Sequence, residues 1–214
     1  MRGSWEGEGE TADVRSPSQL PSNSNHRPVR VAILTISDAA SRGERADSSG
    51  DAIVRWAELR GDAVAARALV PDENGEIVRQ LLDWCDDDRA DLVLTTGGTG
   101  LSPRDVTPEA TRAILEREAP GIAERLRVTA IDSFPRAALS RGLAGTRNRT
   151  LVVNLPGSPG GVSDALTALD PIVNHAVAIL RGEATDHSQG RGPRVEGGES
   201  PQSLDPPPSA LRPR

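Results

Sequence analysis

The amino-acid sequence predicts an α/β fold, built as one three-layer domain that is doubly wound around a mostly parallel sheet. Two observations lead to this prediction. Short β-branched and aliphatic runs alternate along the chain with segments whose apolar residues recur at helical spacing. Each of these runs ends in a turn-forming or glycine-rich segment. Regular alternation of this kind is typical of parallel strands that are connected by helical crossovers.

The domain is expected over residues 29–182 of the 214 in the chain, a length that suits one α/β domain with tails. The flanking segments, residues 1–28 and 183–214, are rich in Gly, Ser and Pro and have no apolar period. Such segments cannot bury enough apolar surface to fold, so both tails are predicted to be disordered.

The predicted strands are aliphatic runs bounded by turn residues, and they cover residues 29–36, 63–70, 92–95 and 150–155. The predicted helices cover residues 49–60, 74–86, 107–118, 120–130, 161–169 and 171–180. Gly61 is a typical helix end. Thr107 is a good N-cap, and Pro108 suits the first helical turn.

The composition excludes several classes of function. A net charge of −6 gives no electrostatic support to general nucleic-acid binding. Aromatic residues make up 2% of the chain and Tyr is absent, so surfaces for stacking bases are lacking. No apolar run approaches the roughly 18 residues of a membrane helix. The polar N-terminal segment has no apolar run typical of a secretory signal, so a cytoplasmic location is expected.

The residues available for catalysis are also limited. Cys85 is the only cysteine, which excludes an intrachain disulfide and a multi-cysteine metal site. With three His residues, a His-based triad or zinc site is not favoured. All 25 basic residues are arginines, which excludes a Walker A lysine and a Schiff base. Positive charge on a bound phosphate must come from arginine, backbone N–H groups, a helix N-terminus or a metal ion.

The most informative segment follows the third predicted strand and contains Gly97, Gly98, Thr99 and Gly100. A glycine loop at the carboxyl end of a strand allows backbone N–H groups to face a phosphate, because no side chain blocks the approach. The same loop can also be an ordinary tight connection. The loop therefore points to a phosphate-bearing ligand only together with the residues around it.

Arg104 and Asp105 stand next in the chain, just before a predicted helix rather than on its solvent face. The functional interpretation has Arg104 binding phosphate oxygens and Asp105 holding Mg²⁺ or orienting the ligand. The alternative is a salt bridge or a capping interaction.

Other predicted strands also end in polar residues, which would meet at one edge of a parallel sheet. Ser37 and Asp38 follow the first strand, and Asp72 follows the second within a Pro-Asp-Glu segment. The segment from Asn154 to Gly157, which contains Pro156, ends the last strand and begins a rigid loop. Asp72 and the segment after Asn154 can equally lie in turns, and Ser37 and Asp38 taken alone favour a strand exit or a helix cap.

Taken together, the segments LTTGGTG and RDVTPEAT, with VPDE and LLDWCDD before them and LSR and NLPGSP after them, closely resemble the MogA/MoaB family. The likeness is strongest to molybdopterin adenylyltransferases and to the G domain of gephyrin, and it covers about residues 29–182. The functionally important aspartates of the family match Asp72 and Asp105. The family's strand-end and loop residues match Ser37, Asp38 and the glycine loop, and the serine of LSR and the asparagine of NLPG match Ser140 and Asn154.

The resemblance implies a homotrimer that transfers AMP from Mg-ATP to molybdopterin and releases pyrophosphate. It implies Mg²⁺, for which Asp72 and Asp105 are the candidate ligands without a choice between them, and a molybdate-inserting MoeA-type protein as the user of the product. The complete RDVTP segment favours catalysis, because some MoaB-like paralogues lose it. Two alternatives remain: a non-catalytic MoaB-like protein that binds molybdopterin, and an interaction module like the receptor-clustering form of gephyrin.

Overall fold

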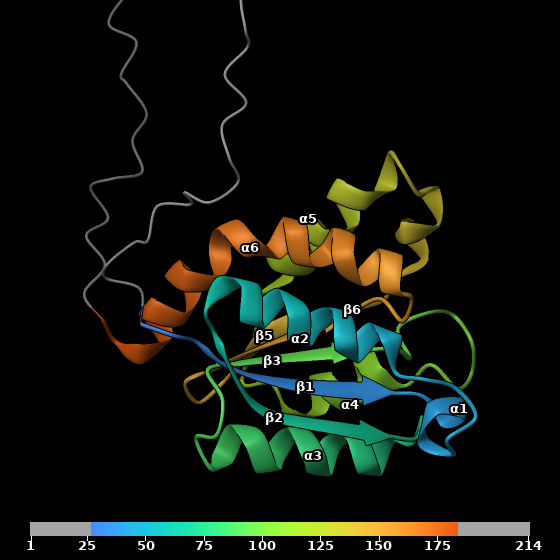
Figure 1. Ribbon diagram of the computed structural model, residues 1–214, viewed down its shortest axis with the longest axis horizontal. Helices are drawn as coiled ribbons and strands as arrows, with labels where there is room; N and C mark the ends of the chain where they lie inside the picture. Colours follow the sequence, from blue (N-terminus) through green and yellow to red (C-terminus); the bar gives the residue numbers. More distant parts are fainter. Residues whose placement is uncertain (1–26, 184–214) are drawn as a thin grey trace, which may run out of the picture.

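The computed structural model describes residues 27–183 and shows a six-stranded sheet with helices on both faces (Figure 1). The strand order is β2-β1-β3-β6-β5-β4. Strands β1 (Arg30–Ile36), β2 (Ala63–Val70), β3 (Leu92–Thr96) and β6 (Thr150–Leu155) run parallel. The three-layer, mostly parallel α/β fold is therefore confirmed. The predicted tails, residues 1–28 and 183–214, lie outside the described residues except at their inner ends.

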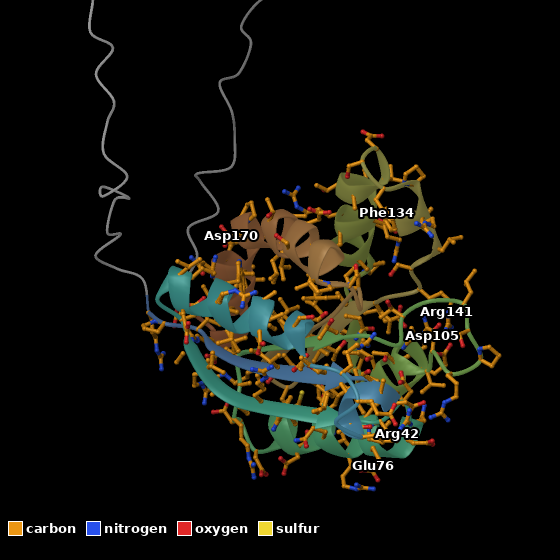
Figure 2. The ribbon with its side chains drawn as sticks, turned by 45° about the vertical axis from the view of Figure 1, so that its right-hand side comes forward. Arg42, Glu76, Asp105, Phe134, Arg141 and Asp170 are labelled. Carbon is orange, nitrogen blue, oxygen red and sulfur yellow. The ribbon has the colours of Figure 1, made fainter. Side chains whose placement is uncertain are left out.

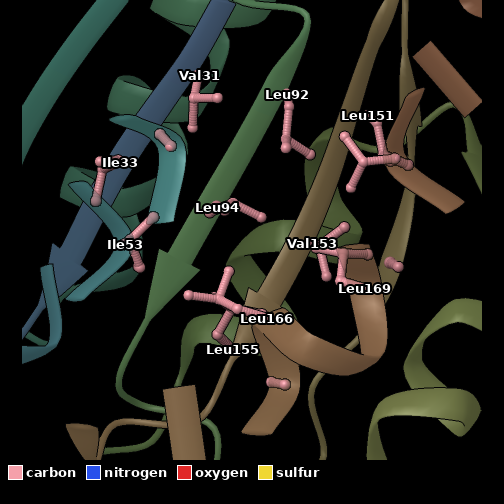
Figure 3. Close-up of a cluster of buried hydrophobic side chains, with 14 of the residues drawn as sticks. Val31, Ile33, Ile53, Leu92, Leu94, Leu151, Val153, Leu155, Leu166 and Leu169 are labelled. Carbon is pink, nitrogen blue, oxygen red and sulfur yellow. The ribbon is translucent and has the colours of Figure 1, made fainter. Parts of the chain in front are cut away.

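Alternation along the central strands divides the core between the two faces. Val31 and Ile33 of β1 face α2 (Ser48–Arg60) and α6 (Pro159–Arg181), with Leu92, Leu94 and Leu151 beside them (Figure 3). Ala32, Leu34 and Ile36 belong to the other cluster, together with side chains of α3 (Asn74–Asp86) and α4 (Thr107–Ile114). A strand buried on both faces reads as a continuous apolar run, as it does here.

The sheet continues beyond β6 with an antiparallel pair that the sequence did not indicate. Strand β5 (Ala144–Arg147) pairs with β6, and β4 (Arg117–Glu118) pairs with β5. The helix predicted over 107–118 is wrong in its last turn, because Leu115 adopts an extended conformation and the chain enters β4. Thr107 is also not the N-cap: it is the first helical residue, and its hydroxyl donates to the carbonyl of Gly97.

The two helices predicted at the end of the domain form one helix, α6. Helix α6 continues across Pro171 because its buried face is unbroken on both sides, through Leu166, Leu169, Val173 and Val177. Helix α5 (Pro120–Ile131) lies beside α6 and is followed by the 3₁₀ segment η1 (Pro135–Leu139). A four-residue helix, α1 (Asp38–Ser41), follows β1. None of the helices in the described range is long and apolar enough to cross a membrane.

Candidate functional site

Two cavities open at the carboxyl edge of the parallel strands, where the strand-end residues meet. The larger has a volume of about 600 Å³ and the smaller about 480 Å³. They share four lining residues, Gly98, Asp105, Gly157 and Ser158. The two cavities therefore meet beside the carboxylate of Asp105, which Figure 2 shows near Arg141.

The larger cavity lies between the glycine loop, α5, η1 and the beginning of α6. Of the residues predicted for the site, it is lined by Gly98, Thr99, Gly100, Asp105, Ser140, Asn154, Pro156 and Gly157. Leu126, Phe134 and Leu139 supply apolar wall, and Arg127 and Arg136 supply positive charge. This combination suits a flat organic molecule that carries an anionic group.

The smaller cavity is more polar and lies above the ends of β1, β2 and β3. Of the predicted residues, it is lined by Ser37, Asp72, Gly97, Gly98, Asp105 and Gly157. Arg45, Asp47 and Ser49, which the sequence did not single out, also line it. Two of its carboxylates, Asp72 and Asp105, come from different loops and can face one ligand.

Two positions of the glycine loop, Gly97 and Gly98, lie so close to neighbouring atoms that a side chain would not fit. Gly97 has φ +101°, and a Cβ there would lie 2.1 Å from the carbonyl oxygen of Ile36. Gly98 has φ +61°, and its Cβ would lie 2.4 Å from Thr107 Oγ1 and 3.1 Å from Asp72 Oδ1. These positions need glycine both for the backbone angle and for the close approach. The loop is thereby held directly over Asp72.

Asp72 and Asp38 hold each other through their backbones. Asp38 N donates to Asp72 Oδ2 at 2.8 Å, and Asp72 N donates to Asp38 Oδ1 at 3.0 Å. Burial raises the pKa of Asp72, and the nearby charges of Asp38 and Asp105 add to this effect. The pKa of Asp38 is lowered by the backbone N–H of Asp72 and by the guanidinium of Arg104. The exchange aims the remaining oxygen of Asp72 toward the glycine loop.

Asp105 is held from two sides. Its Oδ2 accepts from Ser102 N at 2.8 Å, and its backbone carbonyl accepts from the guanidinium of Arg141. Arg141 also donates to the carbonyls of Gly100 and Thr99, and it pairs with Glu109. Arg141 thus joins the glycine loop to the loop of Asp105, a role that sequence reasoning missed although the residue stands next to Ser140.

Among the described residues, no group of three or more His, Cys, Asp or Glu is arranged to hold a metal ion. Asp72 and Asp105 are nevertheless a donor set that suits Mg²⁺. Mg²⁺ is commonly bound by one or two carboxylates, with waters and substrate phosphates completing its shell. The residues present fit a magnesium ion that arrives with a phosphate ligand, rather than an ion caged by protein alone.

Two predicted ligand-binding residues, Arg104 and Asp38, form an ion pair with each other. Arg104 pairs with Asp38 at 2.9 Å and with Glu73 at 3.0 Å, and neither Arg104 nor Asp38 lines either of the two cavities. The structure contains the salt bridge that was the alternative interpretation of Arg104, and phosphate binding by Arg104 stays a prediction. A sequence cannot reveal this pairing, because the partners lie 66 and 31 residues away.

Asn154 lines the larger cavity, but its amide is used within the protein. Its Nδ2 donates to Thr95 Oγ1 and Thr111 Oγ1, both at 2.9 Å, and its Oδ1 accepts from Leu143 N at 3.1 Å. The side chain therefore connects β3, α4 and the chain after Ser140. The amide thus positions its neighbours, and a direct contact of Asn154 with a ligand stays a prediction.

The chain is similar to known proteins in sequence and in fold. A family model described as "Probable molybdopterin binding domain" matches residues 32–175. A molybdopterin adenylyltransferase of Helicobacter pylori is 39% identical over 156 residues, which cover 72% of this chain and 89% of that protein. Another, from Escherichia coli K12, is 39% identical over 140 residues, covering 64% and 72% of the two chains. The crystal structure of the molybdopterin biosynthesis enzyme MoaB from Thermus thermophilus superposes with a TM-score of 0.68 at 51% identity, covering 72% and 97%.

Proposed function

The chain belongs to the molybdopterin-binding domain family, and from this premise we propose that it is a molybdopterin adenylyltransferase. The observation that carries the proposal is the junction of the two cavities at Asp105, Gly98, Gly157 and Ser158. A transferase must bring two substrates together at one point. Asp105 is the only ionisable residue in the described part of the chain that lines both cavities.

The reaction joins two anions. An oxygen of the molybdopterin phosphate attacks the α-phosphorus of ATP, the bond from that phosphorus to the bridging oxygen breaks, and pyrophosphate leaves with the bonding electrons. The attacking phosphate is already largely ionised near neutral pH, so no strong general base is needed. The protein must position the two groups and neutralise their charge.

We assign molybdopterin to the larger cavity and ATP to the smaller one. The apolar wall of Leu126, Phe134 and Leu139 suits the pterin ring, and Arg127 suits its phosphate. Asp72 and Asp105 would hold Mg²⁺, which supplies charge neutralisation for the triphosphate when bound. Both carboxylates line the smaller cavity, which favours ATP there.

A homotrimer, a cytoplasmic location and a MoeA-type partner that uses the product are further proposals, and they rest on the family resemblance. The exposed apolar side chains of Val128, Ile131, Phe134 and Leu139 on α5 and near η1 are compatible with an assembled form. A monomer mass by light scattering at micromolar concentration would contradict the trimer.

The decisive experiment incubates the full chain with molybdopterin, ATP and Mg²⁺. We expect adenylylated molybdopterin and an equal amount of pyrophosphate, detected by chromatography and a coupled phosphate assay. The variant Asp105→Asn, which keeps the side-chain shape, should abolish or severely slow both signals. Molybdopterin binding without any pyrophosphate release would favour the non-catalytic binding protein instead.

A further inference from the structure

Arg45 stands in the loop between α1 and α2 and lines the smaller cavity. One nitrogen of its guanidinium donates to Ser37 Oγ at 3.1 Å. Ser37 is itself only 9% exposed, and its hydroxyl also accepts from Ala40 N at 3.3 Å. Ser37 therefore fixes one nitrogen of the Arg45 guanidinium at the end of β1. The rest of the guanidinium faces the cavity.

Arg45 differs from the other arginines around this cavity in having no carboxylate partner among residues 27–183. Arg67 pairs with Asp47 at 2.6 Å and with Asp51 at 2.8 Å. Arg42, three residues before Arg45 in the same loop, pairs with Glu44 at 2.8 Å. Within the described residues, the guanidinium of Arg45 bonds only to the neutral hydroxyl of Ser37. Its charge is left for a ligand.

The charged residues that line the smaller cavity indicate that the ligand of Arg45 is an anion. The carboxylate of Asp47 is neutralised by Arg67 and caps α2 through Gly50 N. Asp72 and Asp105 are the carboxylates assigned to Mg²⁺. Among the described residues that line this cavity, Arg45 is then the one cation, and the chain has no lysine. A guanidinium is suited to phosphate because its planar N–H groups match two phosphate oxygens.

We propose that Arg45 binds the pyrophosphate portion of ATP, and this inference rests on the proposed function. The α-phosphorus must lie where the cavities meet, beside Asp105, so that molybdopterin can reach it. Arg45 lines only the smaller cavity and is absent from the junction. Adenosine is uncharged near neutral pH, whereas the β- and γ-phosphates are strongly anionic. Arg45 therefore recognises the leaving group and distinguishes ATP from AMP.

The test measures binding of Mg-ATP, AMP and Mg-pyrophosphate by calorimetry, with full-length wild-type protein, Arg45→Ala and Arg42→Ala. Arg42→Ala is the matched control, because it removes the same charge from the same loop outside the cavity. We expect Arg45→Ala to weaken Mg-ATP and Mg-pyrophosphate about tenfold or more, as for loss of a charge-assisted contact. Binding of AMP should change less than about twofold. Arg42→Ala should bind all three like the wild type.

Other results would overturn the inference. Equal losses for ATP and AMP would mean that Arg45 shapes the cavity without contacting pyrophosphate. Equal behaviour of Arg45→Ala and Arg42→Ala, with normal turnover in the wild type, would reject Arg45 and leave the proposed function standing. A third outcome is that the wild type makes no adenylylated product, while Arg45→Ala alone binds Mg-pyrophosphate more weakly. The proposed function then fails and the contact of Arg45 with the anion stands. Equal melting temperatures of the three proteins establish that the variants are folded.

Discussion

At the scale of single residues, the site contains two neighbouring aspartates that the fold places in opposite electrostatic settings. Asp72 is half-buried, and burial raises its pKa. The pKa of Asp38 is lowered, because its carboxylate accepts hydrogen bonds from Asp72 N and from the guanidinium of Arg104. A raised pKa means that the ionised form costs folding free energy, and a lowered pKa means that it contributes folding free energy. Removal of the charge should therefore leave stability unchanged or raise it at Asp72, and lower it at Asp38.

Asp72→Asn is expected to lose activity without losing stability. Turnover should fall on the order of 10²-fold or more, comparable with loss of a strong electrostatic contact in the transition state. The thermal midpoint should hold or rise slightly, because the uncharged amide removes an unfavourable buried charge. Asn can still accept from Asp38 N. Steady-state pyrophosphate release and thermal unfolding measure the two effects.

Asp38→Asn is the matched control and should lower the midpoint at neutral pH. Its stabilising charge is present above the ordinary pKa of aspartate and is lost as pH falls through the lowered value, so the difference from wild type should shrink in acid. In the wild type without Mg²⁺, Asp72 should take up its proton at a pH above the ordinary pKa of Asp, about 3.9, which an NMR titration of its carboxyl carbon measures. An unfolded Asp72→Asn variant, or one with a normal rate, would defeat its assignment.

Arg141 is expected to act as a positioning residue for Asp105. Arg141→Ala should lower kcat about 10²-fold, because a small displacement of a reacting group has an effect of this size. Arg141→Lys should not restore the rate, since one ammonium cannot span the carbonyls of Gly100 and Asp105 as the guanidinium does.

The variant Glu109→Gln distinguishes positioning of Asp105 by Arg141 from a general loss of protein stability. It removes the charge partner of Arg141 and leaves the backbone contacts in place. We expect nearly normal kcat in this variant. Titration of activity with Mg²⁺ gives the second measurement, because a displaced Asp105 should require more Mg²⁺ in Arg141→Ala. Full activity of Arg141→Lys would show that the carbonyl contacts are not needed.

At the scale of the elements, α6 shows how tertiary packing overrides a local helix breaker. Pro171 lies inside the helix, where it has no N–H to donate to the preceding turn. Residues on both sides of it are buried on one face: Leu166, Leu169, Val173 and Val177. Burial of this stripe offsets the cost of the proline, which a reading of the sequence alone assigns to a helix boundary.

Pro171→Ala is therefore expected to stabilise the protein by roughly 1–2 kcal/mol. The substitution restores one helical hydrogen bond and removes a clash, which together are worth about 3 kcal/mol, but it adds up to about 1 kcal/mol of unfolded-chain entropy. Urea unfolding measures the change. The control is Pro120→Ala, a proline in the first turn of α5, where proline is well tolerated. A similar gain in both variants would contradict the explanation.

At the scale of the whole molecule, the two ends of the domain meet at the edge of the sheet opposite the cavities. Asp91, just before β3, accepts from Arg30 of β1 and from Arg181 at the end of α6. The side chains of Asp91 and Arg181 are 5% and 8% exposed. Burial by itself would raise the pKa of Asp91, but the hydrogen bonds from the two arginines outweigh it and hold the pKa below its usual range. The cluster fastens the first strand, the third strand and the last helix together.

Asp91→Ala should therefore lower the free energy of unfolding by about 3–5 kcal/mol, because it leaves the buried guanidinium of Arg181 without its carboxylate partner. Nucleotide binding at about 10 °C, near the usual temperature of maximum stability, should stay close to that of the wild type. Glu76→Ala is the control: Glu76 forms an exposed pair with Arg79, and its loss should cost less than about 1 kcal/mol. Figure 2 labels Glu76. Equal losses would show that the buried cluster adds no special stability.

The sequence by itself determined the parallel core and the edge of the sheet at which the polar strand-end residues meet. Both depend on local signals: the apolar runs of β1, β3 and β6, and the glycines that only a close approach or a positive φ requires. A hydrophobic period reports how one segment is buried, and strand ends of a parallel sheet must share an edge. These inferences need no knowledge of distant contacts.

Tertiary structure decided which polar residues face the cavities and which face each other. Arg104 pairs with Asp38, 66 residues earlier in the chain, while Arg45 is left without an acidic partner in the described residues. The short strands β4 and β5 likewise form by pairing with each other and with β6. Segments of two to four residues are too short to show an apolar alternation in the sequence. Long-range pairing of charges and edge strands is set by the order of the strands in space, and no local pattern encodes that order.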